Sequence, residues 1–198
     1  MKLYSIFFIS FLAMLIGGCG INTSNAQNSS TLENKNSSNS KSLTNNWYTY
    51  VPKDNSYSIK FPQKPQEQIH LLDSPIGKIE LKRVQYIDKN NHTVFGSLHS
   101  NIGTDPKKYD TEQGLNEFVN GTVKSTNGTL VSVKKIYLNG LDGREFIIKT
   151  HKNFFGKGRM FIDPKTPSGY QAFVISKNSQ QLDSPEVLEF FNSFSIVK

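Results

Sequence analysis

The chain contains a single cysteine, Cys19, and this residue directly follows an apolar run near the N-terminus. Residues 20–198 can therefore form no disulfide among themselves and contain no catalytic thiol. Any fold that they adopt must be stabilised by burial of side chains, which about 150 residues can supply without cross-links. Because 36% of the 198 residues are hydrophobic, we expect one globular unit with extensions.

The first 18 residues have the layout of a secretory signal peptide. Lys2 precedes a run over residues 4–16 that is apolar apart from two serines, and two glycines follow it. The run is shorter than the roughly 20 residues that a membrane-spanning helix needs. We therefore expect residues 1–18 to be removed on export.

Residues 16–19 (IGGC) resemble the lipobox of bacterial lipoproteins, in which the cysteine receives diacylglycerol before the chain is cleaved in front of it. The resemblance implies that Cys19 is lipidated and anchors the protein to the bacterial membrane on its extracytoplasmic side, because several acyl chains hold a protein there stably. Gly20 resembles the outer-membrane sorting pattern, so an outer-membrane anchor facing the periplasm is expected if the host has two membranes. The alternative is an ordinary cleaved signal peptide with a chance cysteine.

The lipidated cysteine is followed by a polar segment, so that residues 19–46 form the second part of the chain. Residues 21–46 contain 15 asparagines or serines among 26 positions. Such a segment buries too little apolar surface to offset the entropy of ordering it. We expect a flexible tether with a root-mean-square reach of roughly 30 Å.

Residues 47–198 form the globular domain, in which short alternating segments are separated by proline, glycine and asparagine turns. The pattern predicts strands over 47–51, 57–61, 68–72, 78–87, 93–102, 130–138, 144–150, 159–162 and 170–176. Apolar positions change parity around Lys82-Arg83, which predicts a bulge or bend in that strand. One helix begins at the N-cap Asp110, and a second begins within residues 183–186. This order predicts an α+β fold, an antiparallel sheet flanked by helices.

Three stretches of this domain resemble the PsbP-like fold family of cyanobacterial-type secreted proteins. The first is Trp47 with residues 57–65 (YSIKFPQKP), and the second is residues 138–146 (LNGLDGREF). The third combines residues 159–162 (RMFI) with 190–194 (FFNSF). The resemblance implies a PsbP-like α/β/α sandwich and a non-catalytic role, because family members serve as extrinsic photosystem subunits, assembly factors or partner-binding modules. Fold alone does not define function.

The charge distribution bears on partners. From residue 47 onward there are 20 basic and 15 acidic residues, which leaves a net charge of +5. This balance favours weak contact with anionic surfaces but is too diffuse for a nucleic-acid-binding protein. The expected partners are the membrane, reached through the lipid anchor, and a membrane protein complex or an anionic surface.

No catalytic or cofactor motif is present. The chain has no Gly-x-Ser-x-Gly elbow, and its four histidines, His70, His92, His99 and His151, lack metal-site spacing. We therefore expect no enzyme, no cofactor and no dedicated metal site. A surface site that uses two histidines stays open, because the sequence does not show which strands are neighbours.

The segment 149–159 is the candidate docking site. It places Lys152, Phe154, Phe155, Lys157 and Arg159 around an expected exposed turn, in which Gly156-Lys157-Gly158 forms the hairpin. These side chains could contact a membrane surface or an acidic partner. The alternative is that one phenylalanine fills the core while the lysines solvate the loop.

Two adjacent charged residues, Arg144 and Glu145, follow a glycine in an expected strand. Adjacent strand residues point to opposite faces, so they should not pair with each other, and a buried ion pair with other partners is the favoured interpretation.

The sequence as a whole predicts a membrane-tethered, non-catalytic binding or assembly module. The alternative is a small-ligand or divalent-metal-binding lipoprotein with a pocket between sheet and helix.

Overall fold

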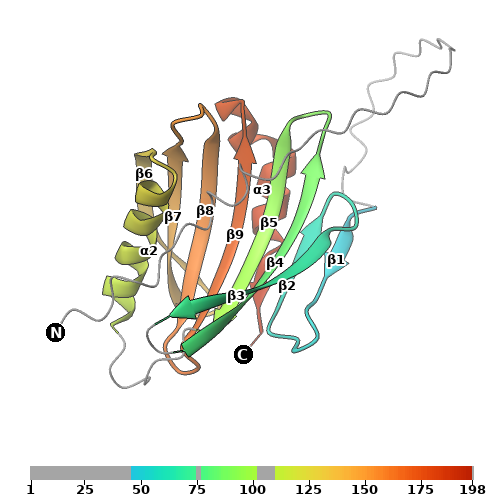
Figure 1. The fold of residues 1–198 in the computed structure, drawn as a ribbon. Coiled ribbons are helices and arrows are strands. Elements are labelled where there is room, and N and C mark those ends of the chain that lie inside the picture. Colours follow the sequence, from blue (N-terminus) through green and yellow to red (C-terminus); the bar gives the residue numbers. More distant parts are fainter. Residues whose placement is uncertain (1–45, 75–76, 102–109, 198) are drawn as a thin grey trace, which may run out of the picture.

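The computed structural model describes residues 46–74, 77–101 and 110–197 (Figure 1). The predicted signal peptide 1–18, the lipidation site Cys19 and the 19–46 linker lie outside these residues. No helix within the described ranges is long and apolar enough to cross a membrane.

A seven-stranded antiparallel sheet forms the centre of the domain. Its strands, in spatial order, are β3 (Gln66–Ser74), β4 (Gly77–Asp88), β5 (Thr93–Asn101), β9 (Ser168–Ser176), β8 (Phe155–Asp163), β7 (Leu141–Lys149) and β6 (Thr129–Leu138). Most neighbours in the sheet are also neighbours in sequence, because hairpin turns connect them. The exception is the β5–β9 pair, which joins the two halves of the chain.

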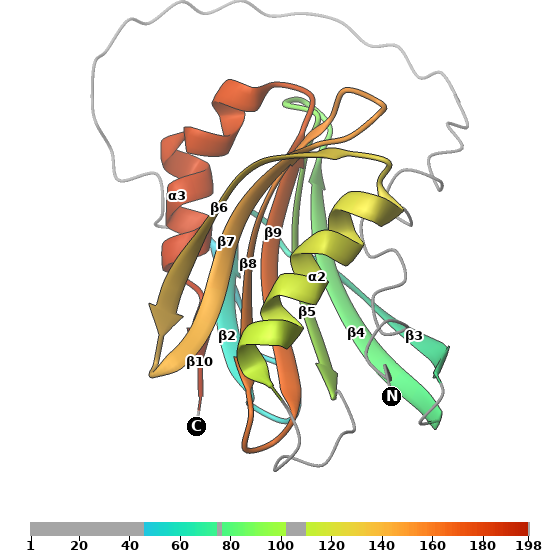
Figure 2. The same cartoon turned by 90° about the vertical axis from the view of Figure 1, so that its left-hand side faces the viewer.

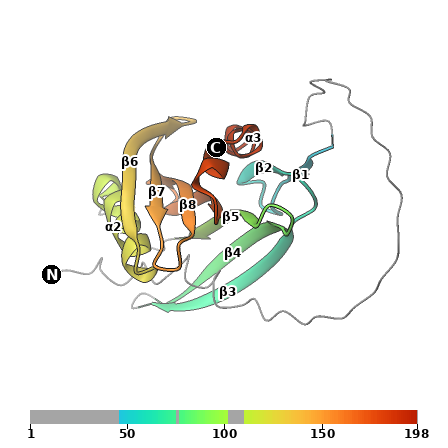
Figure 3. The same ribbon diagram turned by 90° about the horizontal axis from the view of Figure 1, so that it is seen from above.

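The remaining elements cover the two faces of this sheet. A small sheet consists of β1 (Tyr48–Tyr50), β2 (Tyr57–Phe61) and β10 (Ser195–Ile196). Helix α2 (Thr111–Ser125) lies over one face of the large sheet, while α3 (Pro185–Asn192) and the small sheet lie over the other, as Figures 2 and 3 show. A short 3₁₀ helix, η2 (Ser179–Asp183), leads into α3. The expected α+β architecture with helices on both faces is confirmed.

Each face has its own hydrophobic core. Under α2, Leu115, Phe118 and Val119 pack on apolar side chains of the large sheet. On the opposite face, Phe190 and Phe191 of α3 pack with residues of the small sheet. Because both faces are covered, the central strand β9 is buried at every position and shows no alternation.

Both helices begin where local capping chemistry directs them to. Asp110 accepts a hydrogen bond from the backbone amide of Gln113 at 3.0 Å, and the helix begins at the next residue. Ser184 caps α3 by accepting from the amide of Val187, and Pro185 occupies the first helical position. The predicted N-cap Asp110 is confirmed, and the second helix begins within the predicted residues.

The predicted bulge in β4 is wrong. Its register with β3 and β5 is continuous through Lys82 and Arg83. The apolar positions change parity because Leu81 packs in the α2 core and Val84 in the opposite core, so both faces of one continuously paired strand are apolar. The register shifts instead in β6, between Leu130 and Ser132.

The predicted glycine hairpin at residues 156–158 is also wrong, because these residues lie inside β8. A Cβ atom on Gly158 would come within 2.5 Å of the ring of Phe146, so glycine is needed there for the close approach of that ring. The chain turns earlier, where the amide of Asn153 donates to the carbonyl oxygen of Thr150 at 3.0 Å and Asn153 adopts φ 59°.

Candidate functional site

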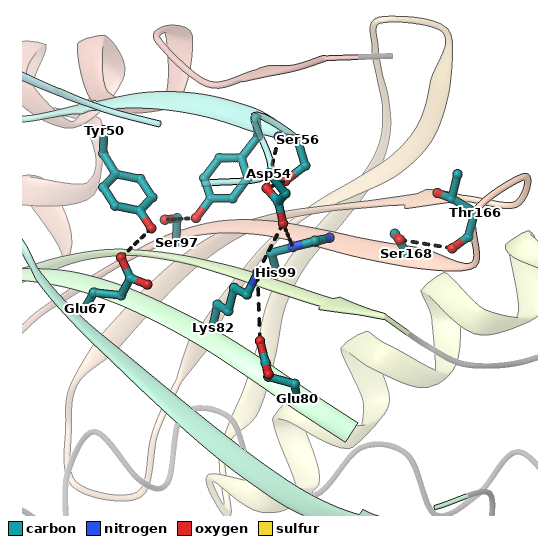
Figure 4. A network of polar contacts seen from close by, with 11 residues as sticks. Tyr50, Asp54, Ser56, Glu67, Glu80, Lys82, Ser97, His99, Thr166 and Ser168 are labelled. Carbon is teal, nitrogen blue, oxygen red and sulfur yellow. Dashed lines mark hydrogen bonds and ion pairs between the residues drawn. The ribbon is translucent and has the colours of Figure 1, made fainter. Parts of the chain in front are cut away.

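A network of charged side chains connects the β1–β2 turn with the large sheet (Figure 4). Asp54 of the turn accepts a hydrogen bond from Lys82 Nζ of β4 at 3.1 Å. The Nδ1 atom of His99 on β5 lies 3.8 Å from the same carboxylate, and Glu80 Oε1 lies 3.8 Å from Lys82 Nζ. Lys82 and His99 are directly paired in the β4–β5 register, so the sheet itself brings the two side chains together.

The electrostatics of this network favour an ionised carboxylate beside a neutral imidazole. Burial alone would raise the pKa of Asp54, but hydrogen bonds from Ser56 and Lys82 outweigh it and lower the pKa to about 2. Burial lowers the pKa of His99, against the smaller opposing effect of Asp54. The ring of His99 stacks on Tyr170 with centroids 4.8 Å apart. At neutral pH Asp54 is therefore an anion held by Lys82.

Two tyrosines extend the network toward the small sheet. Tyr50 donates a hydrogen bond to Glu67 Oε2 at 2.8 Å, and the hydroxyls of Tyr57 and Ser97 lie 3.0 Å apart. Burial raises the pKa of both tyrosines, so both stay protonated. In the part of the chain that the structure describes, no hydrogen bond joins a serine hydroxyl to a histidine. The hydrogen bonds and ion pairs of this network connect the small sheet and its β1–β2 turn to the large sheet.

The candidate docking segment does not form one exposed tip. Lys152 is exposed in the turn, whereas Lys157 is buried. Phe154 and Phe155 are both half-buried and pack against opposite cores, which is the outcome that adjacent positions on two faces produce. Neither phenylalanine is fully exposed, because each face of the sheet has a core to receive one.

The two remaining cations of this segment are held by ion pairs in which one partner is buried. Lys157 Nζ lies 2.9 Å from Asp183 Oδ1, and Arg159 Nε lies 2.7 Å from Glu145 Oε2. Arg159 also donates to the carbonyl oxygen of Phe191 and lies over its ring. Both cations connect β8 to the α3 layer, so their first role is structural.

The interpretation of Arg144 and Glu145 as separate buried ion pairs agrees with the geometry. Arg144 points to the α2 face, where it donates to Glu112 and to Asn116 Oδ1. Glu145 points to the α3 face and binds Arg159 and Lys134. Burial would raise the pKa of Glu145, but the hydrogen bonds from Lys134 and Arg159 outweigh it and lower the pKa.

Five exposed lysines gather at one end of the large sheet, a set that sequence reasoning missed. They are Lys89 in the β4–β5 turn, Lys124 in the last turn of α2, Lys149 at the end of β7, Lys152 in the β7–β8 turn and Lys177 after β9. Thr93 pairs with Ser176, Ser176 with Phe155, and Phe155 with Lys149. These strand ends therefore lie side by side, at the top of Figure 1. We call this set the basic end.

Three acidic residues lie near the basic end and only partly offset its charge. Asp88 is buried and accepts hydrogen bonds from the amides of Asn90 and Asn91. Asp183 is paired with Lys157. Burial raises the pKa of Glu186, and Asp88 adds to the shift. The surface of this end therefore stays positive.

The histidines lie apart from one another. His99 belongs to the Asp54 network, and His151 Nδ1 lies 2.8 Å from the carbonyl oxygen of Thr126. His92 is exposed in a turn, and His70 lies on the opposite face of the sheet from His99. Among the described residues, no group of three histidine, cysteine or acidic side chains could hold a metal ion.

A pocket lies between α2 and the large sheet, where the alternative function would need one. It is small, with a cavity volume of about 20 Å³, and its lining is mainly apolar, with Leu98, Phe146 and Phe173 among the lining residues. The polar residues Thr122 and Gln171 also line it.

Comparison with known proteins identifies the architecture. No protein-family model and no curated protein matches the chain. The solution structure of cyanobacterial PsbP (CyanoP) from Synechocystis is similar with a TM-score of 0.52, 12% sequence identity, and coverage of 76% of this chain and 92% of that one. The fold is PsbP-like. This confirms the fold that the three sequence stretches implied.

A second structure is less similar. It is a crystal structure of a Pseudomonas aeruginosa protein of unknown function, with a TM-score of 0.35, 8% identity, and coverage of 69% of this chain and 85% of that one. This likeness is too low to carry an argument. The PsbP-like architecture therefore rests on CyanoP and on the topology described above.

Proposed function

We propose that this protein is a lipid-anchored, non-catalytic binding module that docks its basic end on an anionic surface at the extracytoplasmic side of a bacterial membrane. The observation that carries the proposal is the gathering of Lys89, Lys124, Lys149, Lys152 and Lys177 at one end of the PsbP-like domain. Lysines near an anionic surface each contribute about 1 kcal/mol of attraction, which falls within a Debye length.

The point where the chain enters the domain supports this orientation. Tyr48 pairs with Phe61, whose ring centroid lies 5.4 Å from that of Phe190. Phe190 in turn lies 5.3 Å from Phe95, close to the β4–β5 turn that carries Lys89. A tether that ends at residue 46 therefore joins the domain on the side of the basic end. A reach of roughly 30 Å allows that end to contact the membrane surface.

The charged groups inside the domain support a binding role rather than catalysis. Asp54, Glu145 and Lys157 are each held by an oppositely charged partner that connects two layers of the fold. We assign these groups a structural role, because removing one partner would leave the other without its counter-charge. The exposed lysines of the basic end, by contrast, are available to a partner.

Vesicle binding tests the proposal directly. Residues 19–198 with Cys19→Ser would be mixed with vesicles of phosphatidylglycerol or of phosphatidylcholine and sedimented. We expect binding to the anionic vesicles alone, with a loss of about tenfold on raising the salt concentration from 0.05 to 0.5 M.

Paired variants locate the contact. Lys89→Gln with Lys152→Gln removes two charges from the basic end, and Lys53→Gln with Lys165→Gln removes two exposed charges elsewhere. The first pair should weaken vesicle binding about tenfold, and the second should leave it within twofold. Equal effects of the two pairs would contradict docking through the basic end.

The alternative, a small-ligand or metal-binding lipoprotein, is supported by one observation. The mainly apolar pocket between α2 and the sheet lies where such a ligand would bind, and Gln171 offers it a polar contact. Saturation of this pocket by a ligand that leaves vesicle binding unchanged would favour this function.

A further inference from the structure

Arg83 differs from the other buried ions of the domain. It lies in β4, faces the α2 side of the large sheet and is 9% exposed. Its Nη2 atom donates to Gln68 Oε1, and its Nε atom has no hydrogen-bond partner. Among the described residues, no carboxylate lies within ion-pair distance of its guanidinium.

Other buried charges in the described ranges have their charge or hydrogen bonds satisfied within the chain. Arg144 is paired with Glu112, Glu145 with Arg159, and Lys157 with Asp183. A buried cation without a counter-charge is unfavourable, so folds normally pair it or omit it. The contrast indicates that the described residues do not supply the counter-charge of Arg83.

Unsatisfied polar atoms surround Arg83 on the same face. Arg83 shares a register row with Gln68, Leu98 and Gln171, and Gln85 lies two residues along β4. The Oε1 atoms of Gln85 and Gln171 are buried without hydrogen-bond partners, as is Nε2 of His70. Buried polar atoms are usually satisfied, so a cluster of such atoms at one place calls for a partner.

The charge of this face selects the chemistry of that partner. The described residues of β3, β4, β5 and β9 that point to the α2 side include no aspartate or glutamate. One guanidinium provides one positive charge, which matches a single carboxylate, and its Nε–H donates to a carboxylate oxygen. The two glutamine Oε1 atoms accept hydrogen bonds, which the hydroxyl groups of a ligand can donate.

We propose that this face binds a small hydroxylated carboxylate, with the carboxylate on Arg83 and hydroxyl groups on Gln85 and Gln171. His70 Nε2 contributes a further polar contact at the edge of the site. Gln171 also lines the small pocket under α2. The site is separate from the basic end and does not depend on docking to a surface.

Calorimetry with the full chain in a non-ionic detergent tests the site, with D-gluconate as the probe. We expect gluconate to bind with a millimolar or lower Kd and to raise the unfolding temperature. Inorganic phosphate and sodium chloride at equal ionic strength are the comparison arms, and both should bind at least tenfold more weakly. Phosphate binding equal to or tighter than gluconate binding would overturn the assignment to a carboxylate.

Two variants make the test specific. Arg83→Gln should weaken gluconate binding at least tenfold while leaving the unfolding temperature without ligand unchanged or higher, because it removes an unpaired buried charge. The control Lys64→Gln removes an exposed charge and should leave binding within twofold. No gluconate binding by the parent chain, unchanged binding by Arg83→Gln, or failure of that variant to fold would each overturn the proposal.

Discussion

Asp54 shows how one side chain can hold two layers of the domain together. It lies in the β1–β2 turn, yet its carboxylate binds Lys82 of the large sheet at 3.1 Å. The partners are 28 residues apart in sequence, so no local pattern indicates that they meet. The strand pattern predicts each strand, but the pairing of the turn with β4 and β5 follows only from the tertiary packing.

The lowered pKa of Asp54 predicts a pH-dependent contribution to stability. Its pKa falls from 3.8 to about 2 on folding, so its contribution is complete above pH 3.8 and is lost as the pH falls toward 2. Since the side chain is 38% exposed, solvent screening leaves about 1 kcal/mol. In urea unfolding, Asp54→Asn should be less stable than the parent by this amount at pH 6 and equally stable at pH 2.

A control separates this effect from the general effect of charge. Asp142→Asn removes an exposed carboxylate from β7 and should leave the difference from the parent near zero at both pH values. A stability loss for Asp54→Asn that is the same at pH 6 and pH 2 would show that the carboxylate charge is not what holds the turn.

At the scale of elements, Lys157 of β8 and Lys152 of the preceding turn should contribute differently to the stability of the domain. Lys157 is buried and lies 2.9 Å from Asp183, whereas Lys152 is exposed in the preceding turn. Lys157→Gln should destabilise the domain by about 1–2 kcal/mol, because Asp183 loses its partner and a buried hydrogen bond changes. Lys152→Gln should change stability by less than about 0.5 kcal/mol. Thermal unfolding of the two variants decides this.

An equal and small effect of both substitutions would mean that Lys157 is a surface residue like Lys152. In the structure Lys157 is buried and Lys152 is exposed, so the two lysines are not equivalent members of one docking tip. Lys152 is flanked by His151 and Asn153 in the turn, whereas Lys157 is flanked by Gly156 and Gly158 inside β8.

Sequence reasoning recovered the elements better than the site. Strand alternation and helix caps are local, so β2 and the caps at Asp110 and Ser184 could be recognised directly. The glycines at 156 and 158 match turn chemistry, which predicts a turn there, whereas Gly158 accommodates the Phe146 ring of the neighbouring strand. The basic end was not recognised as a set because its lysines come from four separate segments, of which only residues 149–159 attract attention in the sequence.

The whole molecule combines a domain of PsbP-like fold with a signal peptide and a lipidation site that only the sequence predicts. Different observations support the two parts. The fold is supported by the strand topology and by the similarity to CyanoP. The lipid anchor rests on the lipobox resemblance of residues 16–19. In the proposed function the anchor would strengthen docking of the basic end, because it keeps the domain near the surface.

The central claim is that Cys19 carries a lipid that anchors the protein to the membrane. Detecting lipidation of Cys19 in the bacterial host tests this claim most directly. Cells that express the parent chain or Cys19→Ser would be labelled with radioactive palmitate and separated into membrane and soluble fractions. We predict a labelled membrane protein for the parent and no label for Cys19→Ser, with that variant in the soluble or unprocessed fraction. Labelled Cys19→Ser protein in the membrane fraction would contradict the account.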